Sequence, residues 1–302
     1  MSSGLGSYHS GSHFYFSLSS ISIIASDLPY LLDWSASTGG VVICPEYALL
    51  PDHKFPDALL QVEDVYRALR QGGAVSALGF EVNRIVVTGE SAGGNLAAAL
   101  CVKICMDSQK ASQEDEVQSG NESIETPTGP GVEEGAMEGV HSSVEPDATP
   151  LLPLPDALML SCAVLNLSLE LSYSRVVGTG DPVLPSGLIS AISDAYLPIG
   201  DGVDKKDPLA SPFFALDTVL CQFPPTLLFA SSNDPLLDDS VVFNQRLRSL
   251  GVESELRAAQ NLPHAYLGLG TAGFPEAQQV QQECQEWLKF QFTRHRDDED
   301  GL

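Results

Sequence analysis

The feature that most limits the fold is an apolar run that leads directly into a glycine-flanked serine and then into an alanine- and leucine-rich segment. Residues 84–89 have the composition of a buried strand. The run Gly89-Glu90-Ser91-Ala92-Gly93-Gly94 follows, and residues 95–105 have helix-forming composition. A strand that turns sharply into a helix places the intervening serine at the carboxyl edge of a sheet. The alternative is a glycine-rich loop in which the serine has no role.

The rest of the chain alternates between short apolar runs and segments with a helical period. The expected strands are 41–44, 157–162, 226–230 and 253–258, and the expected helices are 56–69, 185–196, 240–250 and 276–290. Strands that alternate with helices are typical of parallel crossover units. The sequence therefore predicts an α/β fold with a mostly parallel sheet flanked by helices.

Charge and cysteine content narrow the classes of partner and compartment. The 40 acidic and 15 basic residues give a formal net charge of −25, which repels nucleic acid and anionic lipid but does not penalise a neutral ester or a neutral lipid surface. No apolar run approaches the roughly 20 residues that span a bilayer. The six cysteines lack paired zinc spacing and indicate reduced thiols in a cytoplasmic protein. Cys101 and Cys105, one helical turn apart, suit either core packing or a metal pair, and no further ligands accompany them.

A serine nucleophile requires a base and, in this kind of fold, an acid between the two in the chain. His264 follows the last expected strand, whereas the other five histidines lie near the termini, before Ser91 or in an acidic stretch. Asp234 follows the strand 226–230 and is the expected acid. Asp238 and Asp239 are rivals, although Asp239 would also suit a helix cap.

These motifs together resemble the hormone-sensitive lipase family of α/β-hydrolases. The matching runs are Glu46–Asp52 with Phe55-Pro56, Gly89–Leu96, Asp234–Ser240, Arg246–Gly251 and Leu262-Pro263-His264, within a match from about Pro29 to Trp287. The resemblance implies that Ser91, Asp234 and His264 form a catalytic triad and that the backbone N–H of Ala92 is an oxyanion donor. It further implies an acyl-enzyme mechanism on acylglycerol-like or short-acyl esters, with no metal or organic cofactor.

One departure from the family concerns the oxyanion hole. The family has a His-Gly-Gly-Gly run that should fall near residues 15–18, which contain no glycine, and residues 9–12 are only a faint substitute. About 40 residues precede the strand at Val41, so the fold is expected to be truncated at its amino end. Loss of an oxyanion donor reduces turnover by about 10²- to 10³-fold. The alternatives are therefore a catalytically weak or silent binding protein, or a degenerate chain; His264 favours the enzyme.

The resemblance and the composition together give a domain layout. We expect a poorly matched segment at 1–28, two parts of one α/β-hydrolase domain at 29–106 and 151–292, and an acidic tail at 293–302. Residues 107–150 carry eleven acidic residues and few large apolar ones, which predicts a disordered insertion, either a spacer or a regulatory segment. The expected partners are ester substrates and peripheral contact with lipid droplets; the oligomeric state is left open.

Overall fold

The fold is built on a parallel sheet. The structure, a computed structural model, describes residues 13–18, 24–121, 150–197 and 203–294. Within these ranges the strands are β1 (His13–Leu18), β2 (Val41–Ile43), β3 (Arg84–Glu90), β4 (Ala157–Ser161), β5 (Thr226–Ser231) and β6 (Ser254–Ala259). They lie in the order β2-β1-β3-β4-β5-β6, and every pair of neighbours is parallel. The predicted α/β fold with a parallel sheet is confirmed.

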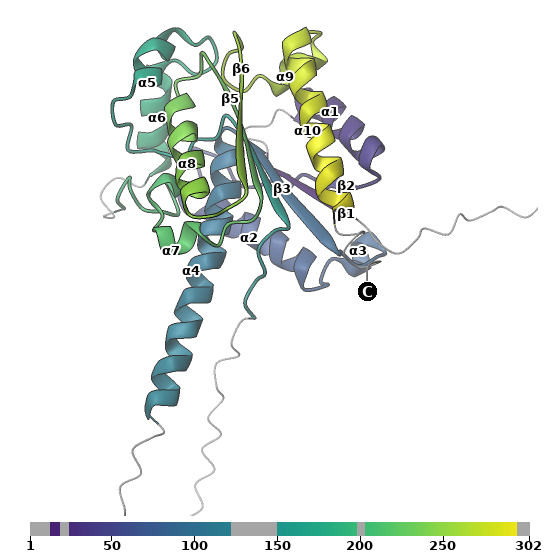
Figure 1. The fold of residues 1–302 in the computed structure, drawn as a ribbon, viewed down its shortest axis with the longest axis vertical. Helices are drawn as coiled ribbons and strands as arrows, with labels where there is room; N and C mark the ends of the chain where they lie inside the picture. Colours follow the sequence, from purple (N-terminus) through teal and green to yellow (C-terminus); the bar gives the residue numbers. More distant parts are fainter. Residues whose placement is uncertain (1–12, 19–23, 122–149, 198–202, 295–302) are drawn as a thin grey trace, which may run out of the picture.

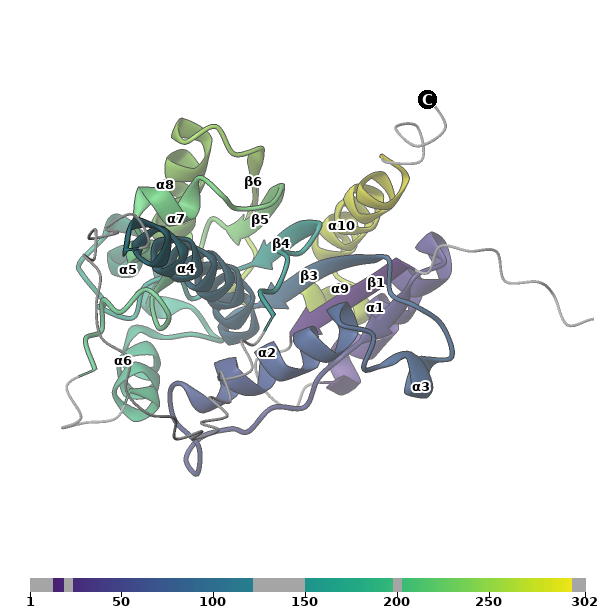
Figure 2. The same cartoon turned by 90° about the horizontal axis from the view of Figure 1, so that it is seen from below.

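Helices cover both faces of the sheet (Figures 1 and 2). One face carries α1 (Ile24–Thr38), α9 (Leu267–Thr271) and α10 (Pro275–Thr293), and the other carries α2 (Asp57–Arg70), α4 (Ala92–Asn121) and α8 (Leu237–Ser249). The short α3 (Val75–Leu78) precedes β3. Between β4 and β5 lie α5 (Tyr173–Val177), η1 (Gly178–Gly180), α6 (Ser186–Tyr196), η2 (Pro212–Phe214) and α7 (Asp217–Leu220).

The side chains of each strand point alternately to the two faces of the sheet, and this divides the core into two layers. Ile85 and Val87 of β3 belong to the cluster under α2 and α4, whereas Val86 belongs to the cluster under α1 and α10. Successive side chains of a strand point to opposite faces, so a fully apolar strand serves both layers. Cys101 and Cys105 are buried in the first of these clusters, where they fill the core.

The strand β1 was not predicted, because serines surround a run of only six residues. It lies between β2 and β3 and pairs with both of them, Phe14 with Val41 on one side and Ile85 on the other. The amino-terminal region therefore supplies an interior strand of the sheet, next to the edge strand β2, in a segment for which the sequence predicted no element.

The helix α4 is longer than predicted. We expected it to end at Cys105 and a disordered insertion to begin at Asp107, but the helix continues to Asn121, so this boundary was wrong. Figure 1 shows its far end projecting beyond the body of the molecule. Residues 107–121 are rich in Gln, Ser, Glu and Asp, and of these Gln and Glu favour a helix by intrinsic propensity. The remainder of the predicted insertion, 122–149, lies outside the described residues. No described helix is long and apolar enough to cross a membrane.

Candidate active site

Ser91 occupies a sharp turn between β3 and α4. Its φ of 55° is in the left-handed region that most residues avoid. The turn is held by backbone bonds, since the Ser91 N–H donates to the Ser161 carbonyl at 2.9 Å and the Ser91 carbonyl accepts from the N–H groups of Asn95 and Val164. A strained residue that its surroundings hold so firmly is typical of a functional site.

Close approach of the backbone explains two of the glycines around this turn. A Cβ on Gly89 would lie 2.3 Å from the Gly93 carbonyl oxygen, and one on Gly94 would lie 2.7 Å from the Cβ of Ala163. Neither separation leaves room for a side chain, so Gly89 allows β3 to meet the start of α4 and Gly94 allows α4 to pass the segment that follows β4.

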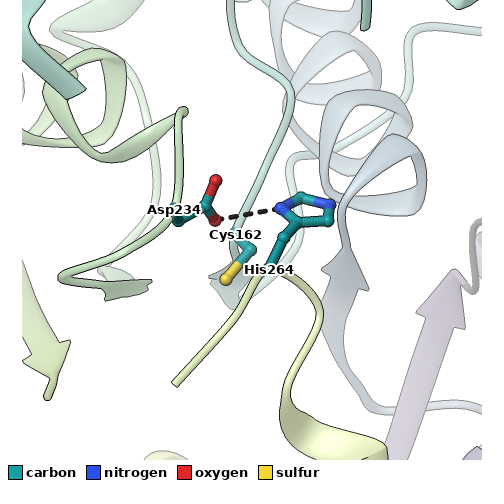
Figure 3. Close-up of side chains that lie close together, drawn as sticks. All are labelled: Cys162, Asp234 and His264. Carbon is teal, nitrogen blue, oxygen red and sulfur yellow. Dashed lines mark hydrogen bonds and ion pairs between the residues drawn. The ribbon is translucent and has the colours of Figure 1, made fainter. Parts of the chain in front are cut away.

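The three residues predicted as a triad form a hydrogen-bonded series with His264 in the middle. His264 Nε2 is 2.7 Å from Ser91 Oγ, and His264 Nδ1 is 2.9 Å from Asp234 Oδ2. Figure 3 shows the imidazole and the Asp234 carboxylate facing each other. His264 and Asp234 are 2% and 1% exposed. The arrangement matches the geometry in which a base activates a serine and an acid orients the base.

The two rival carboxylates are occupied elsewhere. Asp238 Oδ2 accepts from the backbone N–H of Ser174 at 2.7 Å. Asp239 forms a buried ion pair with Arg175 at 2.5 Å, and burial, partly offset by this arginine, raises the pKa of Asp239 to about 6. Only Asp234 of these three aspartates forms a hydrogen bond with His264 in the described structure.

The charges around His264 favour its protonated form. Burial alone would lower the pKa of the imidazole, but the hydrogen bond to Asp234 and the charges of Asp234, Glu90 and Asp181 outweigh it, so the pKa is raised. A base whose pKa is raised accepts the serine proton more readily, provided that it is neutral when the substrate arrives.

Two acidic residues that we did not predict hold the loop that carries His264. Asp181 Oδ2 accepts from the His264 backbone N–H at 2.8 Å, while Asp181 Oδ1 accepts from the N–H groups of Val183 and Leu184. Glu90 Oε1 accepts from the Leu267 N–H at 3.3 Å and from the Ser161 hydroxyl at 3.2 Å. The loop is therefore fixed from both sides. Aspartates and glutamates are common, so only the position of Glu90 beside the serine could have indicated this role.

Glu90 is partly buried beneath the turn. A cavity of about 10 Å³, enough for a single water, is lined there by residues that include Asp27, Tyr30 and Glu90. Burial and the nearby Asp27 raise the pKa of Glu90 to about 7, against the opposing effects of His264 and of the hydrogen bonds from Leu267 and Ser161. The carboxyl group beside the nucleophile thus titrates near neutral pH.

Cys162 follows β4 and lies next to the acid (Figure 3). Ligand atoms of Cys162, Asp234 and His264 lie within 4.8 Å of one another, and all three residues are buried. Burial and the charges of Asp234 and Glu90 raise the pKa of the Cys162 thiol well above its usual range. Both imidazole nitrogens of His264 already have partners, Nδ1 with Asp234 and Nε2 with Ser91, so binding of a cation here would compete with one of these hydrogen bonds.

Ala92 is the first residue of α4. The first N–H groups of a helix have no partner within the helix, and they are oriented to receive a developing negative charge. The region where the family's other donors are expected is only partly described: residues 15–18 belong to β1, and residues 9–12 and 19–23 lie outside the described residues.

A family model for the alpha/beta hydrolase fold matches residues 8–268, most of the chain. The chain belongs to the α/β-hydrolase family. The match begins at residue 8, inside the segment 1–28 that we expected to match poorly, and so includes β1.

The relatives of this α/β-hydrolase include esterases and hormone-sensitive lipases. An esterase of Gibberella moniliformis is 26% identical over 260 residues, 85% of this chain and 65% of that protein. The human hormone-sensitive lipase is 37% identical over 97 residues, 32% of this chain and 9% of that protein. The chain thus spans about two thirds of the fungal relative and far less of the lipases. The predicted resemblance to the hormone-sensitive lipase family is confirmed.

Solved structures agree on the fold. The structure of carboxyl esterase 2 from Tuber melanosporum superposes with a TM-score of 0.72 at 18% identity, covering 92% of this chain and 78% of that one. An esterase from Pyrobaculum calidifontis superposes with a TM-score of 0.69 at 20% identity, covering 92% and 75%.

Proposed function

We propose that this α/β-hydrolase is a serine carboxylic-ester hydrolase that acts through an acyl-enzyme on acylglycerol-like or short-acyl esters. The observation that carries the proposal is the continuous hydrogen-bonded series from Asp234 through His264 to Ser91. The names of the relatives support the same class of reaction.

Each group has one role in the proposed reaction. Ser91 Oγ attacks the ester carbonyl carbon while its proton passes to His264 Nε2, and the Ala92 N–H donates to the resulting oxyanion. Asp234 accepts the Nδ1–H and stabilises the imidazolium. The tetrahedral intermediate collapses, and the alcohol leaves with the proton from His264. Water then attacks the acyl-enzyme, giving its proton to His264, and the carboxylic acid departs as Ser91 regains its proton.

The test is hydrolysis of p-nitrophenyl esters of increasing acyl length. Ser91→Ala should lower kcat/KM by about 10³-fold or more, because alanine has no hydroxyl group to attack the ester. Ser249→Ala, in an exposed serine at the end of α8, is the matched control and should retain full activity. A fluorophosphonate should label Ser91, as read by mass spectrometry. Equal rates for the native chain and Ser91→Ala would contradict the proposal.

We also propose a cytosolic location. All six cysteines are free thiols, four of them buried. Proteins that fold in oxidising compartments commonly pair such residues. Fractionation of cells that express the chain would test the location, and recovery in the secreted fraction would contradict it.

A further inference from the structure

Three side chains of metal-binding types meet next to the candidate nucleophile. Cys162 follows β4, Asp234 follows β5 and His264 lies beyond β6, so the parallel sheet brings them to one edge. One ligand atom of each lies within 4.8 Å of those of the other two. Figure 3 shows Cys162 next to both of the other side chains. Thiolate, imidazole and carboxylate are all ligands that zinc takes in proteins.

The hydrogen bonds of the site indicate which atoms would bind the ion. His264 Nδ1 is 2.9 Å from Asp234 Oδ2, whereas Nε2 faces Ser91 Oγ at 2.7 Å. Asp234 Oδ1 accepts from the Leu236 N–H at 2.8 Å, which leaves Oδ2 on the side of the imidazole. Metal-ligating carboxylates are commonly oriented by such an outer hydrogen bond. The expected ligand atoms are therefore Cys162 Sγ, Asp234 Oδ2 and His264 Nδ1.

Backbone contacts hold Cys162 in place beside the acid. Its N–H donates to the Phe229 carbonyl of β5 at 2.8 Å, and its φ of 45° is in the left-handed region. The residue is fully buried, and its thiol is within hydrogen-bonding reach of Asp234. The thiol is therefore fixed next to the carboxylate and does not face solvent.

The charge around the three residues favours a cation. The carboxylates of Asp234, Glu90 and Asp181 all act on His264. A divalent cation bound by one thiolate and one carboxylate has no net charge, so the assembly buries no uncompensated charge. Magnesium and calcium prefer oxygen ligands, whereas thiolate and imidazole suit zinc. The donor set and the local charge therefore select zinc among the common divalent cations.

We propose that Cys162, Asp234 and His264 bind a zinc ion that inhibits this α/β-hydrolase. On binding, the thiol proton of Cys162 leaves for solvent and the imidazole proton moves from Nδ1 to Nε2, because Nδ1 gives its lone pair to zinc. An Nε2–H can donate to Ser91 Oγ but cannot take its proton, so the serine is not activated. The inference rests on the proposed function for its effect on the rate, and the binding itself requires no turnover.

Zinc inhibition of the full chain tests the effect on the rate. The chain is incubated with zinc chloride before p-nitrophenyl acetate is added, because all three ligands are buried. We expect hydrolysis to slow with zinc and to recover when EDTA is added. Magnesium and calcium at the same concentration should leave the rate unchanged. An active chain that zinc does not slow would overturn the proposal.

Replacement of Cys162 locates the ion. The rate of each variant with zinc is compared with its own rate without metal. Cys162→Ser should raise the zinc concentration for half-inhibition about tenfold or more, because loss of even an outer partner of a metal site costs about 10- to 100-fold in affinity. Cys162→Ala is a second variant in case the first does not fold. Cys221→Ala, at an exposed cysteine, is the matched control and should keep the native sensitivity. Equal sensitivity of the Cys162 variants and the native chain would also overturn the proposal.

Cobalt absorption tests binding without turnover. Co²⁺ can occupy a zinc site with the same ligands, and a thiolate bound to it gives a charge-transfer band in the near ultraviolet. We expect this band in the native chain and in Cys221→Ala, its loss when zinc is added, and its absence from Cys162→Ser. A band that persists in Cys162→Ser would assign the ion to other residues and overturn the proposal. If no chain hydrolyses the ester, the proposed function fails, and the cobalt band alone decides whether the zinc site exists.

Discussion

Asp181 acts on His264 through the backbone rather than through the imidazole. Its carboxylate has one oxygen on the His264 N–H and the other on the turn that precedes α6. A displacement of about 1 Å in a catalytic group can reduce turnover by about 10²-fold, so a residue that fixes the loop matters to the reaction without touching the substrate. We assign Asp181 a positioning role.

Asp181→Asn tests that role. The amide keeps one acceptor oxygen but places an NH₂ group against at least one of the three N–H donors, and it removes a charge that helps to raise the pKa of His264. We expect kcat to fall by about tenfold or more with little change in KM, and the acidic limb of the pH profile to move to lower pH. Asp194→Asn, at an exposed position of α6, is the control. A kcat equal to that of the native chain would contradict the positioning role of Asp181.

Glu90 makes stability depend on pH. Its pKa is about 7 in the fold against 4.5 for an ordinary glutamate, so the folded chain binds this proton more tightly than the unfolded chain. The contribution of Glu90 to the free energy of unfolding is fully present below the pKa that Glu90 has in the unfolded chain. This contribution is lost as the pH rises through about 7. Glu90→Gln removes this dependence and should reduce the fall in unfolding free energy between pH 5 and pH 8 by roughly 2 to 3 kcal/mol. Urea unfolding at the two pH values measures it, with exposed Glu81→Gln as the control. Identical pH dependence in Glu90→Gln would contradict the expectation.

The sequence indicated Ser91, His264 and Asp234 because their chemistry restricts the residue types and their order along the chain. Asp181 and Glu90 were not predicted because their partners are mainly backbone N–H groups, which leave no trace in side-chain spacing.

At the scale of elements, α4 combines a buried and an exposed half. Residues 96–102 are all buried in the core, whereas residues 112–114 are exposed. Gln109 still donates to the Thr218 carbonyl at 2.7 Å, so the connection to α7 extends at least to that residue. Beyond Gln109 the helix depends mainly on its own hydrogen bonds and on residue propensity.

Proline substitutions distinguish the two halves. Gln113→Pro should reduce helical ellipticity while changing the free energy of unfolding by less than about 1 kcal/mol, because few tertiary contacts depend on that turn. Ala99→Pro, at a fully buried position of the same helix, should cost about 3 kcal/mol or more. Circular dichroism with urea unfolding measures both. Unchanged ellipticity in Gln113→Pro would mean that the distal half is not helical in solution.

Composition and periodicity predicted the elements with a long or strongly apolar pattern, such as β3, β5 and α10. They missed β1, which is short and lies among serines, and they missed the distal half of α4, whose polar composition suits a solvated helix as well as a disordered segment. The strand β1 forms because it pairs with β2 and β3, and the distal half of α4 forms because its residues favour a helix. Neither cause produces a hydrophobic pattern in the sequence.

At the scale of the whole molecule, the sheet brings distant residues together at one edge. Register pairs the last residue of β3 with the last residue of β4, Glu90 with Ser161, so the segments that follow both strands emerge side by side. Ser91 follows β3, Asp234 follows β5 and His264 lies beyond β6. Parallel strands therefore assemble the candidate site from segments as far as 173 residues apart.

Because these segments come from both halves of the sheet, the candidate site is complete only while the two halves stay together. If the β5–β6 half detached while β3 stayed in place, Ser91 would be without both the base and the acid at once, so a form opened in this way could not turn over an ester. The rate of hydrolysis in a dilute sample would then count intact molecules, and the decline of turnover during denaturation would report the breakdown of the sheet as a whole.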